Sequence, residues 1–300
     1  MLPVHPSGDR SYVLTLSCPD RIGIVARITT FLAEAGGWIV EASYHSDSDT
    51  GWFFTRQVVR ADSLSFGVQE LRDRFAAVAA QLGGPAQWRI TDTGQPRRAV
   101  LLVTKESHCL YDLLGRVDAD ELPVRISAVI GNRDVLEDLV TAHRVPFYQV
   151  RFPPAGDGPD SAERAAAFKQ LAELVDEHEP DVIVLARFMQ IMPAELCAAW
   201  WGRAINIHHS FLPSFVGARP YHQAHVRGVK LIGATCHYVT PELDAGPIIE
   251  QDVIRVDHRD TVTDMVRRGR DIERLVLARG LRWHLEDRVL VHGNKTVVLR

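Results

Sequence analysis

The stretch Ala99-Val100-Leu101-Leu102-Val103 decides the fold of most of this sequence, because a continuous apolar run is typical of a strand buried on both faces of a parallel sheet. Similar runs follow at 124–130, 147–150 and 182–186, with helix-like stretches between them near 110–116, 135–143 and 161–178. Alternating strands and helices predict a doubly wound, mostly parallel, Rossmann-like α/β domain. Such a sheet binds its ligand beyond the carboxyl ends of its strands.

The residues before this run follow a different pattern. Strand-like segments at 11–17, 38–44, 53–59 and 88–91 alternate with helical segments at 24–35 and 66–82, in the order βαββαβ. This order predicts a ferredoxin-like domain with two helices on one face of an antiparallel sheet. The stretch 94–98 is polar and contains Gly and Pro. We therefore expect a domain at 1–93, a linker at 94–98 and a second domain at 99–300.

One motif of the first domain carries a resemblance. Cys-Pro-Asp-Arg-Ile-Gly-Ile-Val-Ala-Arg-Ile at 18–28 resembles the start of an ACT domain, the amino-acid-sensing module of many metabolic enzymes. The resemblance implies regulation, a homo-oligomer (dimer or tetramer), and an amino-acid effector, with glycine and methionine as candidates, held near Asp20, Arg21, Gly23 and Ile24. Alternatively, Pro19 and Gly23 only form a turn and the domain only dimerises.

Composition narrows the function classes. Of 300 residues, 34 are Lys or Arg and 38 are Asp or Glu, and neither sign forms a long run, so nucleic-acid binding is not indicated. The four cysteines form no CxxC pair, which favours reduced thiols over a disulfide framework or a metal cluster. No signal-peptide pattern opens the chain and no apolar run has membrane-spanning length. We therefore expect a cytoplasmic protein with no membrane partner.

Polar residues with acyl-transfer chemistry occur in Ala204-Ile205-Asn206-Ile207-His208-His209-Ser210-Phe211-Leu212-Pro213. In a strand, Asn206 and His208 point to the same face and could donate hydrogen bonds to a carbonyl oxygen. Asp244 follows the predicted strand 231–239 and could orient the attacking group. Each residue also has an ordinary structural interpretation, and Glu242 could supply the carboxylate instead.

Two loops bear on the ligand. The loop 187–193 is largely apolar, so it could clasp a flat ring, although periodicity favours packing beneath the next helix. The loop Thr104-Lys105-Glu106-Ser107-His108-Cys109 has no glycine to cradle a phosphate, so nucleotide binding is disfavoured.

Taken together, Asn206-Ile207-His208, Ser210-Phe211-Leu212-Pro213 and Leu243-Asp244-Ala245-Gly246-Pro247, with the strand 182–186 and Phe188-Met189, resemble the folate-dependent formyltransferases in order and spacing. The resemblance implies that Asn206 and His208 bind the formyl oxygen, that Asp244 orients the nucleophile, and that no metal or other cofactor is needed. It also implies that two loops hold the pterin of the folate substrate, with these residues: Phe188, Met189, Ile191, Met192, Gly217, Val239 and Thr240.

Departures from the formyltransferase pattern indicate one subfamily of the enzymes with this fold. The loop 104–109 replaces a Gly/Asn-rich phosphate loop, and we expect no RNA-binding domain after 296–299. These features, the ACT-like start and the doubled histidine resemble the formyltetrahydrofolate deformylase family. The resemblance implies hydrolysis of 10-formyltetrahydrofolate to formate and tetrahydrofolate, with formate serving purine synthesis, and His209, His237 and Lys105 around the water. The alternatives are a formyltransferase with a small amine acceptor and an inert folate- or amino-acid-binding regulator.

Overall fold

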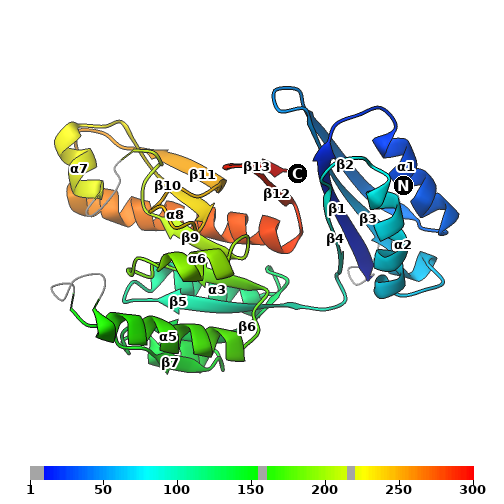
Figure 1. The fold of residues 1–300 in the computed structure, drawn as a ribbon. Coiled ribbons are helices and arrows are strands. Elements are labelled where there is room, and N and C mark those ends of the chain that lie inside the picture. Colours follow the sequence, from blue (N-terminus) through cyan, green and yellow to red (C-terminus); the bar gives the residue numbers. More distant parts are fainter. Residues whose placement is uncertain (1–9, 155–160, 215–219) are drawn as a thin grey trace. The chain divides into compact units, whose positions relative to one another are not determined.

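The computed structural model describes residues 10–154, 161–214 and 220–300 (Figure 1). These residues belong to two units. The first contains the chain up to Pro96 together with Glu286–His292 and Val297–Arg300, and the second contains Arg97–Leu285 and Gly293–Thr296. The change of unit thus falls inside the stretch expected to be a linker, and most of the last residues are grouped with the first unit.

The first unit is built on a four-stranded antiparallel sheet with the strand order β2-β3-β1-β4. Helices α1 and α2 lie on one face of this sheet (Figure 1), where Ile28, Leu32 and Phe75 share a core with Leu14 and Leu16. The predicted ACT-like arrangement is confirmed. The elements are β1 Ser11–Pro19, α1 Ile24–Glu34, β2 Ile39–Asp47, β3 Trp52–Arg60, the 3-10 helix Ala61–Ser63, α2 Val68–Ala80 and β4 Gln87–Asp92.

Residues near the end of the chain cover part of this sheet. Phe54 of β3 packs with Leu290 and Leu299, and the buried Arg56 donates from Nε to the carbonyl oxygen of Glu286 at 2.9 Å. These contacts explain why β3 is buried along nearly its whole length, although helices cover only one face. The C-terminal segment also forms a two-stranded sheet from β12 Val289–His292 and β13 Lys295–Val298.

The second unit contains a seven-stranded sheet with the order β11-β10-β9-β8-β5-β6-β7. The strands from β9 to β7 in this order pair in parallel, and β10 runs antiparallel to both β9 and β11. This confirms the predicted doubly wound, mostly parallel domain. The strands are β5 Arg97–Val103, β6 Val124–Gly131, β7 Phe147–Gln149, β8 Val182–Leu185, β9 Ala204–His208, β10 Leu231–Tyr238 and β11 Ile248–Arg255.

Helices cover both faces of this sheet. Val100 and Leu102 of β5 pack against Phe168 and Leu171 of α5, while α8 runs alongside β10 and β11 (Figure 1). Ser161 caps α5 by accepting a hydrogen bond from the backbone N–H of Arg164. The helices are α3 His108–Asp118, α4 Glu137–Ala142, α5 Ala162–Glu177, α6 Ala194–Ala199, α7 Pro220–Arg227 and α8 Val262–Leu285.

The strand order also fixes where a ligand can bind. From β5 the chain moves to β6 on one side, and it later returns to β8 on the other side of β5. Loops that leave β5 and β8 therefore diverge at their carboxyl ends, which opens a crevice there. Thr104 after β5 accepts a hydrogen bond from the backbone N–H of Met189 after β8, at 3.0 Å, and ties the two loops together.

Two further observations concern the described residues. All four cysteines, Cys18, Cys109, Cys197 and Cys236, are buried and free. None of the helices in the described ranges combines the length and the apolar character that crossing a lipid bilayer requires.

Candidate active site

A pocket of about 230 Å³ opens at the carboxyl ends of β8 and β9. Asn206, His208 and Asp244 all line it, so the structure brings together the three residues that the sequence singled out. Strand pairing explains part of this arrangement, since antiparallel β9 and β10 set Asn206 opposite His237 and His208 opposite Thr235. Glu242, the alternative carboxylate, is exposed and does not line the pocket.

His208 and Asp244 form the central pair of the site. Nδ1 of the buried His208 lies 3.1 Å from Oδ2 of Asp244. Burial alone would raise the pKa of Asp244, but the hydrogen bond from His208 and the neighbouring imidazole rings outweigh burial and lower that pKa. Because an ionised carboxylate only accepts, Nδ1 of His208 carries the proton and Nε2 is the nitrogen left for chemistry. Nε2 is buried and has no partner among the described protein atoms.

Asn206 is oriented by His237. Nδ1 of His237 lies 2.9 Å from the carbonyl oxygen of Tyr238 and must donate to it. Burial lowers the pKa of His237, so its ring is neutral and Nε2 is an acceptor. Nδ2 of Asn206 donates to this Nε2 at 3.1 Å. The amide NH₂ group of Asn206 is therefore fixed, with one N–H on His237 and the second left for a ligand.

The remaining supporting residues occupy different places. His209 lines the pocket beside His208, with 5.2 Å between the ring centroids. Burial and the nearby charge of Arg187 lower the pKa of His209 to about 3, so His209 is neutral near pH 7. Lys105 is exposed and lines a neighbouring cavity, so the structure does not bring it to His208 and Asp244.

The loop residues expected to hold the pterin do line the pocket, but not all in the same way. Phe188 and Met192 are buried in the core beneath α5 and α6, whereas Met189 and Ile191 are more than half exposed. Some apolar side chains of the loop thus pack in the core, and others leave an apolar surface exposed to a ligand. All of the expected folate contacts in described residues border the pocket, namely Phe188, Met189, Ile191, Met192, Val239 and Thr240. Gly217 lies outside the described residues.

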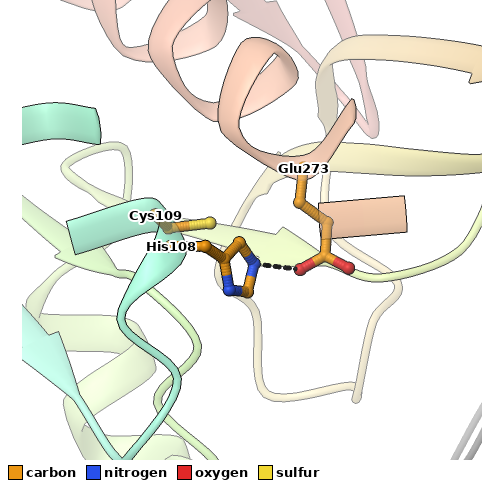
Figure 2. A group of neighbouring side chains, drawn as sticks. All are labelled: His108, Cys109 and Glu273. Atoms are coloured by element: carbon orange, nitrogen blue, oxygen red, sulfur yellow. Dashed lines mark hydrogen bonds and ion pairs between the residues drawn. The ribbon is translucent and has the colours of Figure 1, made fainter. Parts of the chain in front are cut away.

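A second group of polar side chains, which the sequence analysis did not identify, adjoins the pocket. We call it the arginine cluster, and it consists of Arg187, Glu273, His108 and Tyr221. Glu273 is 1% exposed and accepts from the hydroxyl of Tyr221 at 2.6 Å, and its Oε2 lies 2.8 Å from Nε2 of His108 (Figure 2) and 3.5 Å from Nε of Arg187. Arg187 itself lines the pocket. One signal was available in the sequence, because Arg187 directly follows the apolar run of β8, where ligands bind.

His108, Cys109 and Glu273 also lie close enough together to suggest a metal site (Figure 2). Their donor atoms do not fit one. Both oxygens of Glu273 already face Tyr221, His108 or the cation of Arg187, and burial raises the pKa of the Cys109 thiol well above its usual value. A bound cation would have to displace a guanidinium and deprotonate a buried thiol.

The residues expected to contact an effector lie in the turn before α1. The side chain of Asp20 accepts a hydrogen bond from Ser46, and Nη2 of Arg21 donates to the carbonyl oxygen of Gln81. Gly23 has φ 92°, in the left-handed region that favours glycine. Ile24 is 2% exposed and packs in the core, so only its backbone remains for a ligand.

Comparisons with known proteins agree with this fold. Residues 97–281 match the family model described as formyl transferase. A formyltetrahydrofolate deformylase of Bacillus subtilis is 44% identical over 95% of this chain and 92% of its own length, and one of Escherichia coli is 43% identical over 96% and 98%. The crystal structure of a formyltetrahydrofolate deformylase from Pseudomonas syringae pv. tomato has a TM-score of 0.94 and 55% identity, covering 99% of this chain and 96% of that one.

A more distant likeness concerns the second unit. The structure of glycinamide ribonucleotide transformylase 1 from Symbiobacterium toebii has a TM-score of 0.62 and 29% identity, and it covers 68% of this chain and 94% of that one. The formyl transferase domain is thus the class that the fold and the matched model define. The chain belongs to the formyltetrahydrofolate deformylase family within that class.

Proposed function

We propose that Asn206, His208 and Asp244 carry out the hydrolysis of 10-formyltetrahydrofolate to formate and tetrahydrofolate. The family relationship supplies the reaction. The observation that supports these residues is their convergence in one pocket, where Nδ1 of His208 lies 3.1 Å from Asp244 and Asn206 is fixed by His237. Folate is the substrate, and water is the acceptor of the formyl group.

Asn206 stabilises the negative charge that develops on the formyl oxygen. The hydrogen bonds of the described residues use one Nδ2 hydrogen of Asn206, on His237, and leave the second for a ligand in the pocket that Asn206 lines. Donors that are oriented before the reaction stabilise a tetrahedral intermediate more than mobile water does. His237 therefore acts as a positioning residue for Asn206.

His208 moves the proton. Nε2 of the Nδ1-protonated ring accepts a proton from the attacking water, and Asp244 stabilises the imidazolium as it forms. Oδ2 of Asp244 faces His208, and we assign Oδ1 to the water itself. The imidazolium then returns its proton to nitrogen 10 as the bond from that nitrogen to the formyl carbon breaks. Atoms balance, since one water and one formamide give a secondary amine and formic acid, which releases its remaining acidic proton to become formate.

The proposal assigns no step to a metal or a nucleotide. Asn206 and the protonated His208 supply the donors that a Lewis acid would otherwise provide to the oxyanion. Formate release should therefore survive dialysis of the protein against EDTA. Loss of release that zinc or another divalent ion restores would show that a metal participates.

The function is tested by measuring formate and tetrahydrofolate after adding 10-formyltetrahydrofolate to the purified chain with no amine present. We expect equal amounts of both products. Asp244→Asn should abolish most of this release while folate still binds, because the amide can neither stabilise the imidazolium nor orient water as a carboxylate does. Tetrahydrofolate that forms only with an added amine, together with a formylated amine in place of formate, would favour a transferase. Folate binding without turnover would favour an inert regulator.

For the first unit we propose self-association and an amino-acid effector near Asp20, Arg21 and Gly23. The edge strand β2 supports self-association, since Val40 and Tyr44 expose apolar surface beside the exposed Trp38. Sedimentation of the full chain should reveal a dimer or tetramer. Glycine or methionine should change its melting temperature or its rate, and no response to any amino acid would remove the effector proposal.

A further inference from the structure

Arg187 occupies an unusual backbone position at the end of β8. Its φ is 65°, in the left-handed region that long side chains rarely adopt. Such strain tends to persist where the surrounding structure needs one particular side chain, and it concentrates at functional sites. Here the conformation places the guanidinium in the lining of the pocket, beside His209, whose pKa it helps to lower.

The arginine cluster holds this guanidinium in place. Nε of Arg187 lies 3.5 Å from Oε2 of the buried Glu273, which is also fixed by Tyr221 and His108. Burial alone would raise the pKa of Glu273, but His108 and the charge of Arg187 lower it, so Glu273 is an anion. Tyr221 reaches Glu273 only because position 269 is a glycine, since a Cβ there would stand 2.0 Å from the Tyr221 hydroxyl oxygen.

The guanidinium nevertheless keeps donors that no protein atom uses. Nε and Nη1 of Arg187 are buried and have no hydrogen-bond partner among the described residues, and the same is true of Nε2 of His208. Glu273 cannot satisfy them, because 3.5 Å is beyond a good hydrogen bond. Buried unpaired donors are costly, and at a pocket wall they indicate a ligand atom that accepts hydrogen bonds.

We propose that Arg187, anchored by Glu273, donates a hydrogen bond to the attacking water and thereby makes the pocket select water over amines. This inference rests on the proposed function and adds a specificity-determining residue to it. The water accepts from Arg187 through one lone pair and donates its hydrogens to Nε2 of His208 and Oδ1 of Asp244. Its second lone pair forms the new bond to the formyl carbon.

The selection follows from the number of lone pairs. A water oxygen can accept a hydrogen bond and attack at the same time, whereas a neutral amine has a single lone pair and can do only one of these. A protonated amine has none and is repelled by the guanidinium. Glu273 offers an ammonium group no compensation, because its two oxygens already face Tyr221, His108 and Arg187.

The test uses two substitutions of Arg187 in the full chain. Arg187→Met fills similar space and adds no new backbone strain, but it removes every donor. Arg187→Lys keeps one donor and the charge that Glu273 needs. The matched control is Arg270→Gln, which removes another arginine that pairs with a glutamate, Glu106, at an exposed position of the same unit. Each protein receives 10-formyltetrahydrofolate with and without glycinamide, and formate, formylglycinamide and folate KM are measured.

We expect Arg187→Met to lower kcat for formate release by about 10- to 100-fold, the scale of a lost charged donor to a reacting group, with little change in KM. The share of formyl groups captured by glycinamide should rise. Arg187→Lys should fall between Arg187→Met and the wild type, and Arg270→Gln should match the wild type. If Arg187→Met does not melt cooperatively, the double variant with Glu273→Gln removes the unpaired buried charge. Arg187→Lys can also still be compared with the wild type for kcat and product ratio.

Two outcomes would overturn the inference. One is an unchanged kcat and an unchanged product ratio in Arg187→Met, and the other is a raised KM with kcat intact, which would make Arg187 a folate-binding residue. Both differ from failure of the proposed function, in which the wild type itself would release no formate without an amine.

Discussion

The two polar clusters beside the pocket are built in opposite ways. The catalytic cluster consists of Asn206, His208, His237 and Asp244, and it comes from two adjacent strands and one loop. Its described internal hydrogen bonds leave one Nδ2 hydrogen of Asn206 and Nε2 of His208 for the substrate and water. The arginine cluster gathers side chains from the loop after β8 and from α3, α7 and α8 around one buried carboxylate. It balances charge but, within the described part of the chain, leaves two guanidinium nitrogens without a hydrogen-bond partner.

This difference separates two tasks. Strand register fixes the distances between side chains on two paired strands. This suits groups that must contact a transition state. A buried charge that side chains from several helices hold in place gives one wall of the pocket a fixed polarity. Such a wall suits the selection of the molecule that accepts the formyl group. We therefore expect substitutions in the catalytic cluster to change the rate alone, and substitutions in the arginine cluster to change the product ratio or the stability as well as the rate.

The largest effect should come from Asn206→Ala. Removing an oriented oxyanion donor should lower kcat for formate release by about 10²–10³-fold, while the fold and folate binding remain. Steady-state kinetics and a thermal melt of the same preparation would check this. A variant that turns over near the wild-type rate would remove Asn206 from the mechanism and weaken the contrast between the clusters.

The next effect concerns the support of Glu273. Gly269→Ala should lower the free energy of unfolding by about 1–3 kcal/mol, because the new Cβ must displace the Tyr221 hydroxyl from Glu273. Gly115→Ala in α3 is the matched control, since its Cβ meets nothing within 4 Å and should stabilise the helix by about 0.4–1 kcal/mol. Equal responses of the two variants to denaturant would contradict the close packing of Tyr221.

A smaller effect should follow from His237→Leu. Asn206 loses the acceptor that fixes its amide, which is worth about one net hydrogen bond, so kcat should fall roughly tenfold with folate KM unchanged. His237→Gln offers a carbonyl oxygen as a replacement acceptor and should recover part of the rate. If leucine and glutamine give the same kcat, His237 serves packing rather than the orientation of Asn206.

The effect that is smallest near neutral pH is a change in pH dependence. The folded-state pKa of His209, about 3, lies below the unfolded value of about 6.5. Between these values the unfolded chain binds more protons, so this residue makes stability fall as pH drops from about 6.5, by at most about 1.4 kcal/mol per pH unit. His209→Asn should flatten the curve of unfolding free energy against pH. Identical slopes in both proteins would contradict a buried neutral His209.

The sequence predicted the strands of both sheets where apolar runs or alternation were clear, as at 99–103 and 11–17. It assigned no element to 248–285, where β11 and α8 lie. Helix α8 is rich in arginine and contains Gly269 and Gly280, which weaken a helical signal but allow close packing. A Cβ at Gly280 would stand 2.5 Å from the sulfur of Cys236.

The candidate site was predictable to a similar extent. Asn206, His208 and Asp244 stand in recognisable motifs, and strand alternation sets the first two on one face. Their partners depend on register between β9 and β10, which no local pattern reveals, and so the contact from Asn206 to His237 emerged only in three dimensions. The arginine cluster was missed because its members lie far apart in the chain and each is unremarkable alone.

The proposed mechanism depends above all on attack by water on the formyl carbon within this pocket. It is tested most directly by adding 10-formyltetrahydrofolate to the purified chain in ¹⁸O-labelled water, without any amine, and analysing the formate by mass spectrometry. We expect one labelled oxygen in each formate and an equal amount of tetrahydrofolate, with the labelled formate largely lost in Asp244→Asn. Absence of formate, with tetrahydrofolate and a formylated amine appearing only after an amine is added, would contradict it.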